Sequence, residues 1–164
     1  MVQIRWEGFA GNLVQLQEQL DQLRQSAGGR AVVLIDSAGR LLTLVGETPQ
    51  FDLTTFVSLM AADFCATREL ARILGEDNFH TVCHQGEEFS LYLTQVTEGT
   101  ILATVFDRAT TLGLVRYEVR RALPALGGTI REGYGDIAAS SVDLEDGFSD
   151  EVLGRVDKLF GSRT

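Results

Sequence analysis

The sequence contains little cysteine and little histidine. Its two cysteines, Cys65 and Cys83, stand 18 residues apart without a CxxC motif, which gives no support to a disulfide framework or a zinc site. We expect both to be reduced thiols in packed surroundings. Cys83 lies between the only two histidines, His80 and His84, but neighbours on a strand face opposite sides, so Cys83 would point away from both. Packing or hydrogen bonding explains these histidines better than metal ligation, and we predict no metal and no cofactor.

Positive charge is also scarce. Acidic residues outnumber basic ones by 23 to 14, the formal net charge is −9, and Lys158 is the only lysine. Binding to nucleic acid or to an anionic membrane requires a positive field, so we expect neither partner. Arg116, Arg120 and Arg121 form one local basic patch, which is more typical of a solvent-facing helix stripe than of a phosphate site.

Long apolar runs and common catalytic motifs are missing as well. No run approaches the roughly 18 residues that span a bilayer, and the first residues lack the regions of a signal peptide, so we expect a cytoplasmic protein. The sequence has no Walker loop, no GxGxxG after a strand, no GxSxG and no HExxH. Its adjacent acid pairs fall in a turn (residues 87–88) and in the tail (residues 145–146), where nothing excludes water. These absences favour a protein that binds other proteins over an enzyme.

The apolar pattern that is present predicts eight elements. Leu13, Leu16, Leu20 and Leu23 recur at helical spacing before Gly28 and Gly29. A hairpin, a helix and three strands joined by short turns follow, with predicted ranges 31–35, 41–45, 52–74, 79–84, 89–96 and 100–107. A last helix begins after Thr111, and we expect Pro124, Gly127 and Gly128 to kink or end it. The predicted fold is α/β (α+β): a five-stranded antiparallel sheet between one helix on one face and two on the other, in the order αββαβββα, with an acidic C-terminal tail.

The predicted helix at 52–74 has two contrasting faces. At about 100° per residue one side is apolar and should pack on the core; it comprises Leu53, Phe56, Val57, Met60, Phe64, Ala71 and Leu74. The opposite side carries Ser58, Ala62 and Cys65, followed by Glu69 and Arg72. Short side chains let another backbone approach closely, which suggests a flat docking platform. Alternatively, alanine fills neutral positions because it is a good helix former.

The tail differs in composition from the rest of the chain. Residues 136–151 include six acids and no base, so we expect mobility there. Ser149 can then cap a short helix near residues 150–160. Its apolar face would comprise Phe148, Leu153, Val156, Leu159 and Phe160. We predict a domain at residues 1–126 and a tail at 127–164 that is either a tethered binding motif, which we favour, or a helix that folds back onto its own domain.

Three stretches resemble the Roadblock family, and within it the bacterial MglB-type regulators of a Ras-like GTPase. They are VVLIDSAGRLLTLVGET, ELARILGEDNF and TVFDRATTLGLVRYEVRRA, and the similarity covers roughly residues 5–123. The resemblance implies a homodimer paired through the edge strand. The residues implied at that interface are Phe79, His80, Thr81, Val82, Cys83 and His84. It further implies that the two long helices lie side by side and carry a small GTPase of the MglA type.

We predict a docking set on the solvent side of the long helix, of which the resemblance itself implies Cys65 and Glu69; the set is Ser58, Ala62, Cys65, Ala66, Glu69 and Arg72. Glu69 departs from the small residue expected there. The resemblance implies a protein, not itself an enzyme, that stimulates GTP hydrolysis by reshaping its partner and serves polarity or motility control. An arginine finger from Arg68 or Arg72 is a conceivable alternative.

Two other functions remain open. One is a Roadblock adaptor that recruits a GTPase without activating it. The other is a small-molecule sensor, since profilin-like and PAS-like domains share this order of elements. A sensor needs a cavity, whereas Phe56, Phe64, Phe89 and Phe106 suggest a filled interior.

Overall fold

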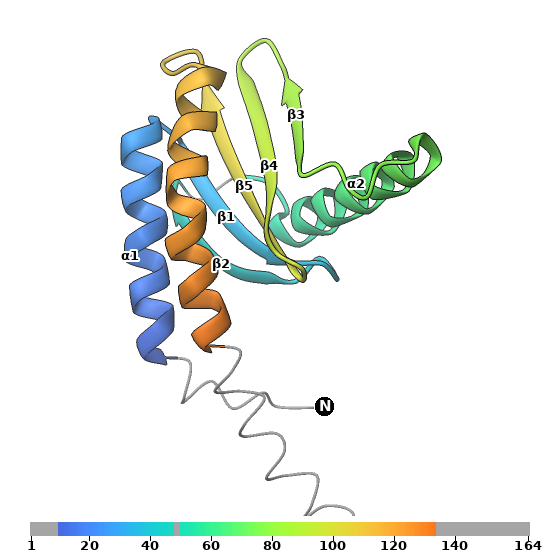
Figure 1. Ribbon diagram of the computed structural model, residues 1–164. Coiled ribbons are helices and arrows are strands. Elements are labelled where there is room, and N and C mark those ends of the chain that lie inside the picture. The colour runs from blue at the N-terminus through green and yellow to red at the C-terminus, as the bar shows by residue number, and fades with distance from the viewer. Residues whose placement is uncertain (1–9, 48–49, 134–164) are drawn as a thin grey trace, which may run out of the picture.

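A computed structural model describes residues 10–47 and 50–133. It confirms the predicted fold class. The elements are α1 (Ala10–Ala27), β1 (Ala31–Asp36), β2 (Leu41–Gly46), α2 (Leu53–Leu74), β3 (Thr81–Gln85), β4 (Phe89–Thr97), β5 (Thr100–Asp107) and a third helix at residues 112–133. The antiparallel sheet has the order β2-β1-β5-β4-β3 (Figure 1). β2 and β3 are therefore its two edge strands.

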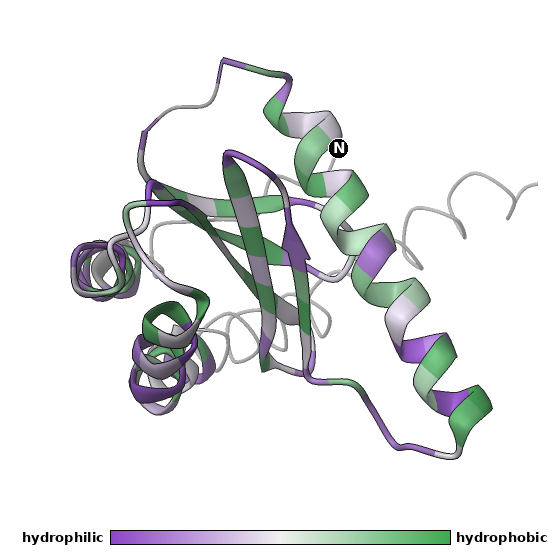
Figure 2. Cartoon of the chain, turned by 90° about the horizontal axis from the view of Figure 1, so that it is seen from above, coloured by the Kyte–Doolittle hydropathy of each residue, from purple (hydrophilic) through white to green (hydrophobic). Residues whose placement is uncertain are grey.

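The sheet is covered on both faces. Seen from above, α1 and the third helix lie on one side and α2 lies on the other (Figure 2). Leu20, Leu102 and Val119, all fully buried, belong to the cluster under the two helices. Ile35, Phe64 and Leu93 belong to the cluster under α2. Because the interior strand β1 contributes to both clusters, all six of its residues are buried.

The turn between β1 and β2 is fixed by one carboxylate. Asp36 accepts hydrogen bonds from the backbone amides of Ala38 (3.0 Å) and Arg40 (2.9 Å). Gly39 has φ of +80°, and a Cβ there would lie 3.0 Å from the Ser58 Cα atom. This turn therefore needs glycine both for its backbone conformation and for its close approach to α2.

The expectation that the third helix ends at Pro124, Gly127 and Gly128 is wrong. The helix passes through Pro124, Gly127 and Gly128 without interruption and reaches residue 133. An internal proline costs about 3 kcal/mol, and each glycine about 1 kcal/mol. Leu126 and Ile130 offset this cost because both are buried in the core, where each contributes about 1.5–3 kcal/mol. The helix thus extends beyond residue 126, into the predicted tail, while residues 134–164, with the helix predicted near residues 150–160, lie outside the described residues.

We predict that Leu126→Ala lowers the free energy of unfolding by about 2–5 kcal/mol, because the side chain is fully buried. Denaturant titration followed by circular dichroism measures this change. Ala125→Ser, at an exposed neighbouring position, is the matched control and should stay within about 0.7 kcal/mol of the original chain. Equal stability of both variants would show that the helix beyond Pro124 does not support the core.

Two apolar side chains that were expected in the interior, those of Leu74 and Phe89, are exposed at the surface. Leu74 is 71% exposed, because the end of α2 extends past β3 and beyond the sheet (Figure 1). Phe89 is 55% exposed at the start of β4, where α2 does not cover the sheet. Phe64 and Phe106 are buried as expected, and Phe56 is half-buried. Among the described residues, no helix is long and apolar enough to cross a membrane.

Candidate interaction site

Both ends of α2 are fixed by local hydrogen bonds. Asp52 caps the N-terminus by accepting from the Thr54 amide at 3.0 Å. Hydrogen bonds from the Thr55 hydroxyl and backbone, followed by the Thr54 amide, hold the pKa of Asp52 below its ordinary value. At the other end Gly75 is left-handed, with φ of +78°, and donates its amide to the Ala71 and Arg72 carbonyls. The helix is therefore well defined up to the end that extends past the sheet.

The predicted docking residues lie on the solvent side of α2. All six are exposed: Ser58, Ala62, Cys65, Ala66, Glu69 and Arg72. The two charged members pair with each other, because Arg72 Nη1 lies 3.0 Å from Glu69 Oε2. Arg72 therefore balances the charge of Glu69, the position where a small residue was expected. The other four docking residues have short, uncharged side chains and span about two turns of the helix.

Three large apolar side chains on the same surface of α2 are missing from the predicted docking set. Leu59, Leu70 and Ile73 are 63%, 57% and 80% exposed. Together with Ala62 and Ala66 they recur at spacings of three and four residues, which is itself the signal of a continuous apolar helix face. α2 therefore has one apolar face on the sheet and another directed to solvent. An exposed apolar row of this length is typical of a protein interface.

The edge strand β3 is shorter and later than predicted. It covers Thr81–Gln85 and pairs with β4, whereas Phe79 and His80 precede it. His80 still joins the sheet edge, because its carbonyl accepts from the Gln95 amide at 3.2 Å and from the Thr94 hydroxyl at 3.1 Å. On its other side, β3 pairs with no strand in the described part of the chain. Such an edge is a template for pairing with another chain.

Side chains of β3 alternate between the two faces of the sheet. Val82 packs against the cluster under α2, and His84 on the same face has its Nε2 atom 2.7 Å from Asp63 Oδ2 of α2. This contact ties the edge strand to the helix. Cys83 faces the opposite way, as expected, and therefore does not join the histidines.

The prediction that both cysteines are packed is wrong. Cys65 and Cys83 are exposed. Cys65 lies on the solvent side of α2, and Cys83 lies on the edge strand, so no described helix or strand covers either thiol. The remaining burial of Cys83 nevertheless raises the pKa of its thiol.

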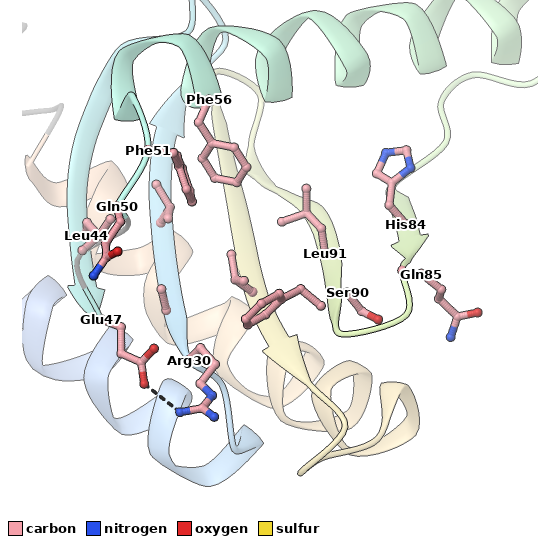
Figure 3. A pocket seen from close by; sticks show the side chains of 15 residues that line it. Arg30, Leu44, Glu47, Gln50, Phe51, Phe56, His84, Gln85, Ser90 and Leu91 are labelled. Carbon is pink, nitrogen blue, oxygen red and sulfur yellow. Dashed lines mark hydrogen bonds and ion pairs between the residues drawn. The ribbon is translucent and has the colours of Figure 1, made fainter.

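An apolar groove lies on the same face of the sheet as α2, beyond the start of that helix (Figure 3). Its volume is about 790 Å³. The apolar lining comprises Ala31, Val33, Leu44, Phe51, Phe56, Phe89, Leu91 and Val105. The end of β3 forms one border through His84 and Gln85. The groove was not expected from the sequence, because the aromatic side chains that should fill the interior line an open surface instead.

The charged residues Arg30 and Glu47 at the border of the groove bond to one another, while Gln50, Gln85 and Ser90 add uncharged polar side chains to the lining. Arg30 lies 2.8 Å from Glu47 and 2.6 Å from Asp107. Hydrogen bonds from the Ala109 amide and then from Arg30 hold the pKa of Asp107 below its ordinary value. These charges are therefore already satisfied, and the groove offers mainly apolar surface to an occupant.

A family model decides the wider relationship. The Roadblock/LC7 domain matches residues 15–106. This range runs from the second turn of α1 to the last residue but one of β5. The chain belongs to the Roadblock/LC7 family. Comparison with curated proteins finds no match.

Solved structures give the same relationship in three dimensions. Myxococcus xanthus MglB is 33% identical with a TM-score of 0.69, and the match covers 72% of this chain and 96% of that one. MglB from Thermus thermophilus, described as a gliding protein, is 32% identical with a TM-score of 0.69, covering 74% and 92%. An MglB described as having a tetrameric arrangement is 32% identical with a TM-score of 0.70 and the same coverage. The fold and this likeness place the chain beside MglB proteins within the Roadblock/LC7 family.

Proposed function

We propose that the chain is a homodimeric regulator of a small Ras-like GTPase of the MglA type, and that the partner docks on the paired α2 helices. The observation that carries this proposal is the solvent-directed apolar row of α2, in which Ala62 and Ala66 leave a flat surface between larger side chains. The likeness to MglB structures supports the class of partner. A cytoplasmic location and a role in polarity or motility are part of the same proposal.

Three features of one chain support pairing through β3. The edge of β3 offers unpaired backbone groups, the groove borders the end of β3, and α2 extends past β3 with Leu70 and Leu74 exposed. In an antiparallel pair, the start of one β3 lies beside the end of the other. The projecting helix end of each copy would therefore lie over the sheet of the second copy, near its groove. This arrangement buries apolar surface twice, as an isologous interface does.

The small-molecule sensor is the less favoured alternative. The groove is large enough for a ligand, but its border charges bond to each other instead of pointing at a ligand. Ligand sites usually combine apolar walls with a few free polar groups. Gln50, Gln85 and Ser90 also line the groove, but the groove borders the end of the edge strand β3, where a second copy would cover it, and this position favours a protein interface.

We propose further that the regulator stimulates GTP hydrolysis without donating a catalytic residue. Arg72 is paired with Glu69, and Arg68 stands on the helix surface beside the small residues. Stimulation then results from tighter binding of the hydrolysis-competent conformation of the GTPase than of its other conformations.

We expect the double variant Arg68→Ala/Arg72→Ala to retain stimulated hydrolysis within about 3-fold, whereas loss of an arginine finger costs about 10³-fold or more. Phosphate release from the GTP-loaded partner measures this, with binding checked separately. A fall to the basal rate with binding intact would establish an arginine finger. Binding without any stimulation by the unaltered chain would identify an adaptor instead.

A further inference from the structure

The third helix carries a row of arginines on its outward face. Arg116, Arg120, Arg121 and Arg131 are exposed, and at about 100° per residue they fall on the side opposite the buried residues of that helix. Arg121 pairs with Glu118 at 2.9 Å. Within residues 10–47 and 50–133, the other three form no ion pair. An anionic segment would therefore meet three arginine side chains that are free of carboxylates in the described structure.

Between Arg120 and Arg131, the outward side of the helix carries small residues. Pro124 is exposed and short, and a Cβ atom at Gly128 would meet nothing within 4 Å. The Arg131 guanidinium lies over Gly127, 3.4 Å from the position of a Cβ there. From Arg116 to Arg131 the row extends about 22 Å, at about 1.5 Å per residue. The outward face is thus a shallow cationic track along most of the helix.

The chain that follows this helix has the complementary charge. Residues 136–151, the acidic segment, hold six carboxylates and no base, in a protein with a net charge of −9. Ten residues separate residue 133, the last described residue of the helix, from Asp143, enough to extend about 33 Å. Arg116 lies only about 26 Å back along the helix from residue 133. The acidic segment can therefore reach every arginine of the row, and its covalent attachment gives a high local concentration.

We propose that the acidic segment binds back along the arginine row of the third helix of the same chain. Asp136 lies near Arg131, and the acids at residues 143–146 lie near Arg120 and Arg116. This contact holds the apolar segment at residues 148–160 on the face of the sheet that α1 and the third helix cover, opposite α2. Because the attraction is between exposed charges, it weakens as salt shortens the screening length.

Paramagnetic relaxation in the full-length chain tests the contact. A spin label is attached at Ser141→Cys in a Cys65→Ser/Cys83→Ser background, so that neither exposed native thiol is labelled. At low salt we expect strong broadening of the amide signals of residues 116–121, and recovery of these signals at about 1 M NaCl, where the screening length is about 3 Å. Arg116→Glu/Arg120→Glu should abolish the broadening. Arg121 is left unchanged because its loss would strand the buried Glu118 carboxylate.

Arg68→Glu on α2 is the matched control, since it removes an exposed arginine elsewhere and should leave the broadening unchanged. A mixed sample of isotope-labelled chains and separately spin-labelled chains identifies the chain of origin. The same broadening in the mixed sample would mean that the segment binds a second copy, which overturns the intramolecular contact. Equal signals at low and high salt, or broadening confined to α2 or β3, would also overturn it.

Discussion

Ala62→Arg should abolish GTPase docking while leaving the regulator folded and dimeric. Ala62 is exposed in the middle of the small surface of α2, so a longer side chain there points away from the described part of its own chain. In a complex, however, the arginine would hold the partner away or be buried without a counter-charge, which costs several kcal/mol. We expect binding to weaken by at least about 100-fold, equivalent to about 2.7 kcal/mol.

Isothermal titration with the GTPase bound to a non-hydrolysable GTP analogue measures this loss. Ala125→Arg is the control, because Ala125 is an exposed helical alanine on the third helix, on the other face of the sheet. It should bind as the original chain does. Unchanged binding by Ala62→Arg would remove α2 as the docking surface.

Leu70→Asp/Leu74→Asp should convert the dimer into a folded monomer. The two leucines lie one turn apart on the end of α2 that extends past the sheet, and they are 57% and 71% exposed. Charges there cost the single chain little. In the paired state, four leucines lose their apolar burial, worth about 6 kcal/mol or more in total, which corresponds to an increase of about 10⁴-fold in the dimer dissociation constant.

Light scattering coupled to gel filtration gives the mass directly, with 17.9 kDa as the monomer value. Val14→Asp replaces an exposed apolar residue of α1, on the opposite face, and should remain dimeric. A double variant that still has twice the monomer mass would show that the end of α2 takes no part in pairing. Both variants need a circular dichroism spectrum like that of the original chain for the comparison to hold.

The bounds of helices and strands were predicted best where one regular spacing of apolar residues lies between clear start and end residues. The bounds of α2 follow from Asp52 at its start and Gly75 at its end, and the predicted strand at residues 100–107 agrees with β5. These features depend on local chemistry, namely capping, glycine geometry and alternating burial. The placement of one helix on one face and two on the other followed from the need to cover a sheet that is apolar on both sides.

The features that could not be predicted depend on packing between distant parts of the chain. Pro124 is a local signal to stop, but burial of Leu126 and Ile130 continues the helix. Leu74 repeats the core spacing of α2, yet α2 has already left the sheet at that residue. The groove beside Phe89 exists because α2 covers only part of the sheet. No local pattern contains the angle at which a helix crosses a sheet, so exposed ends and grooves require the tertiary structure.

Hydrogen–deuterium exchange of the full-length chain, with and without the GTPase bound to a GTP analogue, tests whether paired α2 helices form the docking surface. The account predicts that β3 amides are already slow to exchange in the free protein, because a second copy pairs with them, and that added GTPase newly protects residues 58–72. Fast exchange along β3 in the free protein, or new protection confined to α1 and the third helix, would contradict it.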